Sequence, residues 1–389
     1  MSDISGIQAT AHSVGQSKPS NEQNTILFRV DANSEVGAGH LMRCIALAFG
    51  FQHYQITCVF LVDDGTNSYL QGLQGFPFNT LQKDAACLDE IDWIQSVSGS
   101  TQAIGIVLDG YQFSETYREK LSGIGLPVVA IDDTNTVGKL FADVVINPVS
   151  SATGLNYVVT APDATLLLGS DYILLRPEFI NESLSDRLPD ELPEDKQRKN
   201  ELYQSRQSCL ISFGASDASG LTIPVLDALR TSQLGDSPIT VVTGGAYSST
   251  VQLRALVSDV KLTNKSITHL EHVSNMAPVL RSAKMAISAA GGTVFELAAM
   301  GVPTILLVVA DNQLGAALEQ QEKGWCHVID ARQSLSMDDL ISAAQCLWTN
   351  NNLRLEMHHH AIENAVTDGA QRAAGEIVSH IQESVREIM

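Results

Sequence analysis

The residues best suited to chemistry follow a glycine turn near the start of the chain, Gly37-Ala38-Gly39-His40. Glycine has no Cβ, so the backbone N–H groups of this turn can approach a ligand closely. His40 would lie in the first turn of a helix and can exchange protons near neutral pH, which makes it the candidate general base or acid. Arg43 lies three residues further on and shares its helix face. The alternative is that His40 completes a polar edge of the domain and Arg43 pairs with a surface acid.

A second glycine turn, Gly291-Gly292-Thr293, lies in the C-terminal half of the chain and is followed by Glu296. Free backbone amides at the start of a helix suit a phosphate. The Glu296 carboxylate could accept hydrogen bonds from the two vicinal hydroxyls of a ribose. The alternative needs no ligand, because Thr293 and Glu296 have the T-x-x-E spacing of a capping box, in which the two side chains satisfy the first N–H groups of a helix.

Further polar side chains follow the ends of expected strands. Asn312 and Gln313 carry amide groups that suit sugar hydroxyls. Asp109, Asp132 and Asp133 could bind sugar hydroxyls or orient His40, although the capping of helices or turns is the interpretation that we favour from the sequence. The consecutive histidines 358–360 cannot share one helix face, so a solvated helix surface is expected there rather than a metal site.

The elements that must position these residues alternate between short apolar strands and helical patterns, which predicts parallel sheets covered on both faces. A charged, proline-containing segment at 181–207 interrupts this rhythm and is expected to be a linker, with at most a short surface helix. We therefore predict a disordered segment at 1–24, an α/β domain at 25–180 and a second α/β domain with terminal helices at 208–389. The expected strands are 26–30, 56–61, 104–108, 128–131 and 144–146 in the first domain, and 209–213, 239–243, 285–288 and 304–309 in the second.

Two doubly wound domains of this kind face each other across a cleft, and ligands bind outside the carboxyl ends of such strands. The chain of 389 residues carries 24 basic and 44 acidic residues, a net charge of −20. That balance excludes nucleic acid and an anionic membrane surface as main partners. No stretch approaches the ~20 apolar residues of a membrane span. The six cysteines lack a C-x-x-C pair and are predicted to be reduced and buried, which favours the cytoplasm.

Six motifs, in order, resemble one family. The 285–313 run, a strand followed by GGTVFE, a helix, GVP, a second strand and DNQ, resembles the nucleotide half of GT-B-type glycosyltransferases such as the MurG family. Together with ILFRVDANSEVGAGHLMRCIALA, DGY at 109–111, IDD at 131–133, LLGSDYILLRPEF at 167–179 and ISFGASDASGLT at 211–222, it is similar to the PseG family of UDP-2,4-diacetamido-2,4,6-trideoxy-β-L-altropyranose hydrolases. The similarity spans residues 25–375.

The resemblance implies a GT-B fold and a UDP-sugar substrate from the pseudaminic acid pathway, whose product decorates surface glycans or flagellin. His40 would activate water for inverting attack on the anomeric carbon, and no metal or cofactor is needed. Gly291, Gly292 and Thr293 would hold the phosphates and Glu296 the ribose. The remaining substrate contacts are expected from Gly37, Gly39, Arg43, Tyr111, Asn312 and Gln313.

The chain also departs from the family pattern. Gly110 stands where the family commonly has a second histidine, and the loop after Phe213 reads GASDASG rather than GGADP. Arg176 matches a family position but could simply pair with an acid. A glycosyltransferase of the same architecture, acting in surface polysaccharide synthesis, remains the alternative function, and the oligomeric state is open, a monomer included.

Overall fold

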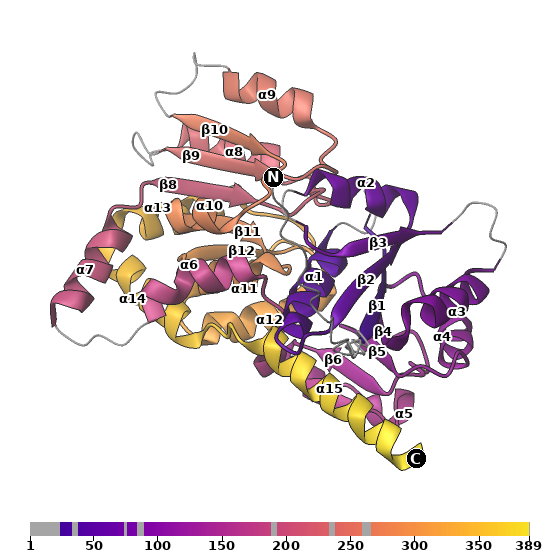
Figure 1. Cartoon of the computed structure of the whole chain (residues 1–389). Helices are drawn as coiled ribbons and strands as arrows, with labels where there is room; N and C mark the ends of the chain where they lie inside the picture. The colour runs from indigo at the N-terminus through magenta and orange to yellow at the C-terminus, as the bar shows by residue number, and fades with distance from the viewer. Residues whose placement is uncertain are drawn as a thin grey trace, which may run out of the picture.

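The computed structural model describes residues 24–32, 38–73, 76–83, 89–187, 193–232, 238–258 and 266–388. The expected segment 1–24 therefore lies almost wholly outside the described residues. The described chain forms two α/β domains, each built on a parallel sheet with helices on both faces (Figure 1). The prediction of two doubly wound α/β domains is confirmed.

The first sheet has seven strands in the order β3-β2-β1-β4-β5-β6-β7. Alternate residues of β1 face opposite cores, as the twofold repeat of a strand requires: Phe28 packs beneath α1, and Leu27 packs on the side of α3 and α4. The strands are β1 Thr25–Val30, β2 Thr57–Val62, β3 Asn79–Gln82, β4 Ala103–Asp109, β5 Val128–Ile131, β6 Val144–Asn147 and β7 Thr165–Leu168. The helical segments are α1 Gly39–Gln52, α2 Asp64–Gly72, α3 Glu90–Thr101, α4 Glu115–Ser122, η1 Ser150–Gly154, α5 Tyr157–Thr160 and η2 Ser170–Tyr172.

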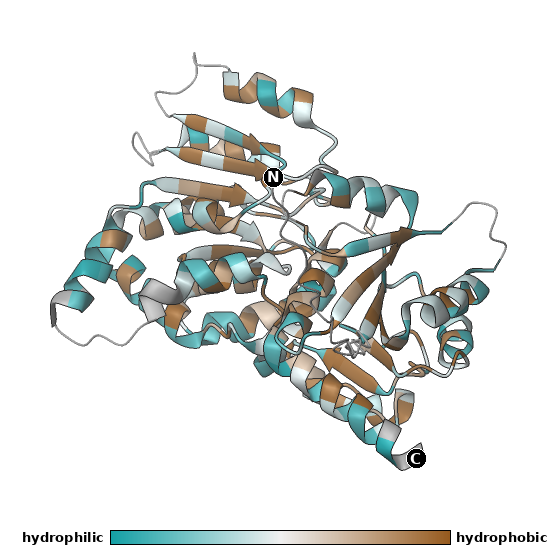
Figure 2. Cartoon of the chain, in the orientation of Figure 1, coloured by the Kyte–Doolittle hydropathy of each residue, from teal (hydrophilic) through white to brown (hydrophobic). Residues whose placement is uncertain are grey.

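The second sheet has six strands in the order β10-β9-β8-β11-β12-β13. It too separates two cores, with Leu210 and Leu306 on one face and Ile211 and Ile305 on the other. The strands are β8 Ser208–Ser212, β9 Ile239–Thr243, β10 Ile267–Glu271, β11 Ala283–Ala289, β12 Thr304–Val308 and β13 Cys326–Asp330. The helices are α8 Thr222–Thr231, α9 Thr250–Ser258, α10 Ala277–Ser282, α11 Thr293–Ala299, α12 Asp311–Glu322, α13 Met337–Thr349 and α14 Asn351–Asn364. The strands of both sheets are predominantly hydrophobic (Figure 2).

The segment expected to be a linker is largely helical. Helix α6, Pro177–Arg187, begins before residue 181, and α7, Pro193–Gln204, follows it. Phe179 is fully buried in the core of the second domain. The Tyr203 ring at the end of α7 stacks on His358 with ring centroids 4.3 Å apart. These contacts dock the segment onto the second domain rather than leave it solvated.

His358 is correspondingly buried, at 4% exposure, and its Nδ1 lies 2.7 Å from the carbonyl oxygen of Gly301. The expected solvated histidine surface is therefore wrong at this position, because α14 turns this one side chain inward. Cys87 lies outside the described residues, and among the described cysteines burial differs from the expectation at one position. Cys346 is exposed, whereas Cys44, Cys58, Cys209 and Cys326 are buried.

The final helix, α15 Gly369–Ile388, crosses back to the first domain and lies along α1 (Figure 1). Ala373, Ala374 and Ile377 belong to the core beneath α1. The two helices approach so closely that a Cβ at Gly50 would stand 2.3 Å from the carbonyl oxygen of Ala370. The packing thus assigns α15 to the first domain, in contrast to the expected domain at 208–389.

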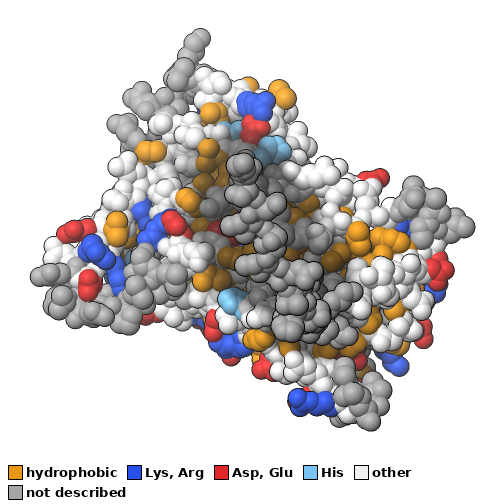
Figure 3. Space-filling model, viewed as in Figure 1, with side chains coloured by type: hydrophobic (Ala, Val, Ile, Leu, Met, Phe, Trp, Pro, Cys, Tyr) orange, Lys and Arg blue, Asp and Glu red, His pale blue; other side chains and the backbone are white. Residues whose placement is uncertain are grey.

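Among the described residues, no helix combines the length and apolar character that a membrane crossing requires. Among the described side chains visible in Figure 3, lysine and arginine form small groups, several of them beside acidic side chains.

Candidate active site

The candidate catalytic histidine lies where the topology brings the start of α1 against the end of β4. Strand β1 pairs in parallel with β4, so the helix that follows β1 begins above the last residue of β4, Asp109. Gly37 lies outside the described residues. A Cβ added at Gly39 would meet no atom of the described chain within 4 Å, so the backbone there is open to a ligand.

His40 and Asp109 form a buried pair. His40 Nδ1 lies 2.7 Å from Asp109 Oδ1, with His40 8% exposed and Asp109 fully buried. An ionised carboxylate only accepts hydrogen bonds, so the 2.7 Å contact assigns the proton to Nδ1, which donates a hydrogen bond to Asp109. Arg43 Nη2 lies 3.0 Å from the same nitrogen and donates to Asp109 Oδ1 at the shorter distance of 2.7 Å. In the neutral ring the proton on Nδ1 leaves Nε2 as the nitrogen that can take a proton. A carboxylate that orients a histidine and stabilises its charged form is the arrangement expected behind a general base.

Arg43 clamps the carboxylate of Asp109 and a second one. Its Nε and Nη2 lie 2.6 and 2.7 Å from the two oxygens of Asp109, and its Nη1 lies 2.6 Å from Asp133 Oδ1. Although burial alone would raise the pKa of Asp109, the charges of Arg43 and His40 hold that pKa well below its usual range. Arg43 likewise lowers the pKa of Asp133 against the effect of burial. Both carboxylates therefore remain ionised at neutral pH.

This arrangement changes the interpretation of three residues. Capping was favoured for Asp109 and Asp133, but their described side-chain contacts run to His40, Arg43 and Tyr111. Arg43 was expected to bind substrate, and in the described structure its guanidinium pairs with two carboxylates. Asp132 does hold a turn, accepting from the backbone N–H of Asn135 at 2.7 Å.

Tyr111 covers the histidine. Its ring meets that of His40 edge to face at 4.7 Å, and its hydroxyl donates to Asp133 Oδ2 at 2.6 Å. Burial and the charge of Asp133 raise the pKa of Tyr111, so the phenol keeps its proton and acts as a donor. The ring is 49% exposed and can contact a substrate. Gly110 has φ +146°, a region that favours glycine, so the backbone here disfavours a histidine at this position.

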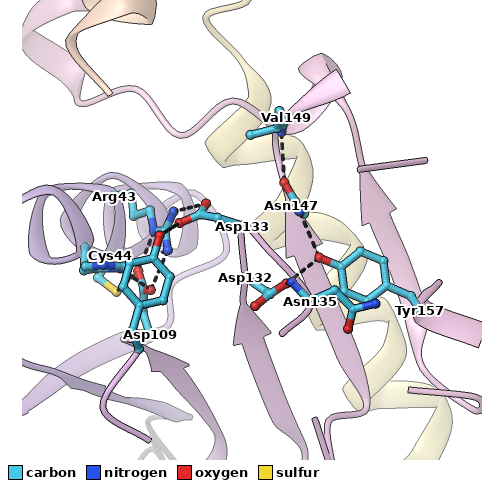
Figure 4. A network of polar contacts seen from close by, with 11 residues as sticks. Arg43, Cys44, Asp109, Asp132, Asp133, Asn135, Asn147, Val149 and Tyr157 are labelled. Carbon is cyan, nitrogen blue, oxygen red and sulfur yellow. Dashed lines mark hydrogen bonds and ion pairs between the residues drawn. The ribbon is translucent and has the colours of Figure 1, made fainter. Parts of the chain in front are cut away.

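A second polar network lies beside the first at the ends of β5 and β6 (Figure 4). The Tyr157 hydroxyl donates to Asp132 at 2.5 Å and accepts from the Asn147 side-chain amide at 2.8 Å. Asn147 in turn accepts from the backbone N–H of Val149 at 3.1 Å. Since Asp132 and Asp133 are neighbours in sequence, this network fixes the loop that carries Asp133. Tyr157 and Asn147 had no sequence signal that marked them as partners of this loop.

The second glycine turn joins β11 to α11 in the other domain. A Cβ added at Gly291 or Gly292 would meet no described atom within 4 Å. Gly292 has φ −57°, which any residue can adopt. Neither packing nor backbone conformation of the described chain therefore requires Gly292. The open space above this turn is what close approach of a ligand to the backbone would need.

The capping box considered as the alternative for Thr293 and Glu296 does not form. Gly292 occupies the N-cap position of α11 and makes no side-chain capping hydrogen bond, so Thr293 is already the first helical residue. Glu296 instead faces Arg176, whose Nη2 lies 3.4 Å from Glu296 Oε1. Arg176 also pairs with Glu178 at 2.6 Å, which agrees with the acid pairing considered for it. Burial raises the pKa of Glu296, and Arg176 only partly offsets this.

Asn312 and Gln313 lie in the first turn of α12. Asn312 is exposed. The side-chain oxygen of Gln313 accepts from the backbone N–H of Val309 at 3.0 Å, which closes the end of β12 and leaves the amide NH₂ for another partner.

The loop after Phe213, whose sequence differs from the family pattern, is held by Asp217. The carboxylate of Asp217 accepts from the N–H groups of Leu221 and Thr222 at the start of α8. Within the described ranges, no group of three or more His, Cys, Asp or Glu side chains is placed to hold a metal ion.

Comparisons with known proteins agree with this architecture. Residues 208–373 match the glycosyltransferase family 28 C-terminal domain. The crystal structure of MurG from Acinetobacter baumannii superposes with a TM-score of 0.58 at 17% identity, covering 92% of this chain and 99% of that one. This chain has the GT-B fold. A Staphylococcus aureus MnaA structure determined with UDP shares the architecture, with a TM-score of 0.59, 14% identity, and 94% and 97% coverage.

Three curated relatives of this GT-B chain are distant. An uncharacterised protein of Methanocaldococcus jannaschii, MJ1062, is 23% identical over 72% of this chain, which spans 55% of that relative's length. The spore coat polysaccharide biosynthesis protein SpsG of Bacillus subtilis is 22% identical over 84% of this chain and 90% of its own. The UDP-2,4-diacetamido-2,4,6-trideoxy-beta-L-altropyranose hydrolase of Campylobacter jejuni is 22% identical over 77% and 97%.

Proposed function

We propose that this GT-B chain hydrolyses a UDP-linked sugar by attack of water on the anomeric carbon. The observation that carries the proposal is the His40–Asp109 pair, a histidine oriented by a buried ionised carboxylate with Nε2 left as the base. The substrate that we propose is UDP-2,4-diacetamido-2,4,6-trideoxy-β-L-altropyranose. This choice is supported by the activity for which the Campylobacter jejuni relative is named and by the six motifs that resemble its family.

In the proposed step, a water hydrogen-bonded to His40 Nε2 attacks the anomeric carbon and passes one proton to that nitrogen. The new C–O bond forms as the bond from the anomeric carbon to the diphosphate oxygen breaks, and the electron pair leaves with UDP. Attack opposite the leaving group inverts the configuration. Asp109 stabilises the imidazolium, and Arg43 keeps Asp109 ionised and in place. UDP is already a good leaving group, so the step needs no general acid.

The proposed nucleotide site is the glycine turn of the second domain. Gly291, Gly292 and Thr293 would offer backbone N–H groups to the diphosphate, and the open space at both glycines supports this. The carboxylate of Glu296 would accept the ribose hydroxyls. Asn312 and the amide NH₂ of Gln313 would face the sugar. Gly39 has open space where a Cβ would lie, and Tyr111 is partly exposed, so both could contact the sugar from the first domain.

A glycosyltransferase is the second candidate, and the family 28 match favours it. That match covers the half of the molecule that would bind the nucleotide, a task that a hydrolase and a transferase share. The Bacillus subtilis relative is also named for a role in polysaccharide biosynthesis. Both candidates need a base at the position of His40, and they differ in whether water or a sugar hydroxyl loses the proton.

Turnover in ¹⁸O-labelled water without any acceptor separates the two. We expect UDP release and a free sugar that carries the label at its anomeric oxygen, as measured by mass spectrometry. UDP release that begins only when a glycan acceptor is added would identify a transferase. Label on the phosphate would show attack at phosphorus and would contradict the mechanism.

Glu296→Gln is expected to weaken UDP binding about 10–100-fold, since a hydrogen bond to a charged group contributes about 1.5–3 kcal/mol. Isothermal titration with UDP measures the change. The unfolding temperature should not fall, because burial raises the pKa of Glu296 and its ionised form therefore costs stability at neutral pH. Glu356→Gln, at an exposed position on α14, is the matched control. A lower unfolding temperature with unchanged UDP affinity would show that Glu296 serves the fold alone.

A further inference from the structure

Arg118 on α4 is a buried arginine that lies beneath the turn carrying Tyr111. It is 2% exposed. Its Nε donates to the carbonyl oxygen of Phe113 at 3.1 Å, and its Nη2 donates to that of Gly110 at 3.5 Å. One guanidinium thus holds both ends of the four-residue turn that follows β4 and Asp109.

Every residue of this turn has a partner in the first domain. The Tyr111 hydroxyl donates to Asp133, and the Gln112 side-chain amide donates to Asp31 at 3.0 Å. The Phe113 ring lies against the Arg29 guanidinium, at 5.0 Å, and the Tyr117 ring, at 4.9 Å. The backbone of Gly110 occupies the glycine-favoured region, so the turn has a specific shape that must be maintained. Arg118 is the contact that joins its first residue to its last.

Arg118 is costly to bury for this contact alone. Its Nη1 has no hydrogen-bond partner among the described residues. A buried cation without a directly paired carboxylate lowers the stability of the fold. Burial lowers the pKa of Arg118, while the charges of Asp132 and Asp109 raise it.

We propose that Arg118 is a positioning residue for the reaction: it fixes the Gly110–Phe113 turn so that Tyr111 stays against His40. The inference deepens the proposed function and rests on it for the identity of the reaction. Arg118 touches none of the groups proposed to bind UDP, since these belong to the other domain. Its loss should thus affect turnover and leave nucleotide affinity unchanged.

The test compares Arg118→Gln and Arg118→Lys with wild type by kcat, KM, UDP affinity and hydrogen exchange of the 110–113 amides. We expect kcat to fall about 10²-fold in Arg118→Gln, the scale on which a displacement of about 1 Å acts. The UDP affinity should stay constant, and the lysine variant should recover part of kcat because its ammonium group can still donate to a carbonyl group of the turn. Exchange should accelerate in the 110–113 turn and not in the second domain.

Arg230→Gln is the matched control, because Arg230 is also a buried arginine with an unpartnered Nη1, on α8 of the second domain. It should keep wild-type kcat. Unchanged kcat in a folded Arg118→Gln, or an equal loss of kcat and UDP affinity, would overturn the proposal. If the glutamine variant does not fold, the lysine variant must lower kcat at constant UDP affinity, or the proposal fails. If wild type releases no UDP, the proposed function fails, and unchanged exchange at 110–113 in either Arg118 variant would overturn the positioning role separately.

Discussion

His40→Ala is expected to lower kcat about 10²–10⁴-fold, the range that one general base contributes. The loss should fall on kcat and leave UDP affinity unchanged, because the proposed nucleotide contacts lie in the second domain. Truncation also removes the ring that Tyr111 packs against and one partner of the buried Asp109 carboxylate, which Arg43 continues to pair through both of its oxygens. Steady-state kinetics with the UDP-sugar and UDP titration measure the two effects.

His53→Ala is the matched control for His40→Ala, since His53 is the exposed residue that ends the same helix, α1. It should retain wild-type kinetics. If the His40→Ala protein still released UDP at the wild-type rate, His40 would not be the general base. Loss of UDP affinity in parallel with kcat would show that the variant disturbs the whole molecule.

Asp109→Asn is the second prediction with a large effect. The amide can offer its NH₂ group to His40 Nδ1, which would place the remaining ring proton on Nε2 and leave no base toward the substrate. The corresponding change in a Ser-His-Asp triad lowers kcat about 10⁴-fold, and we expect a loss of about 10³–10⁴-fold here. The stability should also fall, because breaking a buried ion pair costs about 3–5 kcal/mol.

The pH dependence of stability provides an independent check on Asp109. The pKa of Asp109 is held below its ordinary value of 3.8 by Arg43 and His40, against the effect of burial. An acid whose pKa is depressed by folding stabilises the fold above its unfolded pKa, and this stabilisation is lost as the pH falls through the folded pKa. The stability difference between wild type and Asp109→Asn should therefore be largest at neutral pH and shrink below about pH 4.

Urea unfolding at several pH values measures this difference. Asp330→Asn is the control, because Asp330 pairs with Arg332 at the exposed surface. Exposed ion pairs contribute little, so its stability and its kinetics should stay close to wild type. A stability difference for Asp109→Asn that did not change with pH would contradict an ionised carboxylate at this position.

The central strands of both sheets could be predicted from the sequence, and the edge strands could not. Strands such as β1, β4, β8 and β12 are buried along their whole length or nearly so, and they appear as continuous apolar runs. The four strands that were missed, β3, β7, β10 and β13, are the edges of the two sheets. Strand β3 is mostly exposed, so its sequence, NTLQ, has no hydrophobic signal to distinguish it from a loop.

The candidate site also combines features that the local sequence predicts with contacts that only the fold reveals. The position of His40 after a glycine turn, and the two open glycines before α11, follow from local spacing alone. The clamp of Arg43 on Asp109 and Asp133 joins residues 66 and 90 positions apart, so only the strand order reveals it. Helix capping was favoured for Asp109 and Asp133 because each follows a strand, and a local pattern cannot show which distant side chain will meet a carboxylate.

The sequence by itself determined that the chain alternates strands and helices in two domains, and which glycine turns end strands where ligands bind. Those features depend on hydrophobic periodicity and on glycine, which act over a few residues. The tertiary structure alone decided that Glu296 faces Arg176 instead of capping α11, that His358 is buried against Tyr203, and that α15 returns to the first domain. Each of these outcomes depends on contacts between segments far apart in the chain, whose free energy is set by burial and charge in the folded molecule.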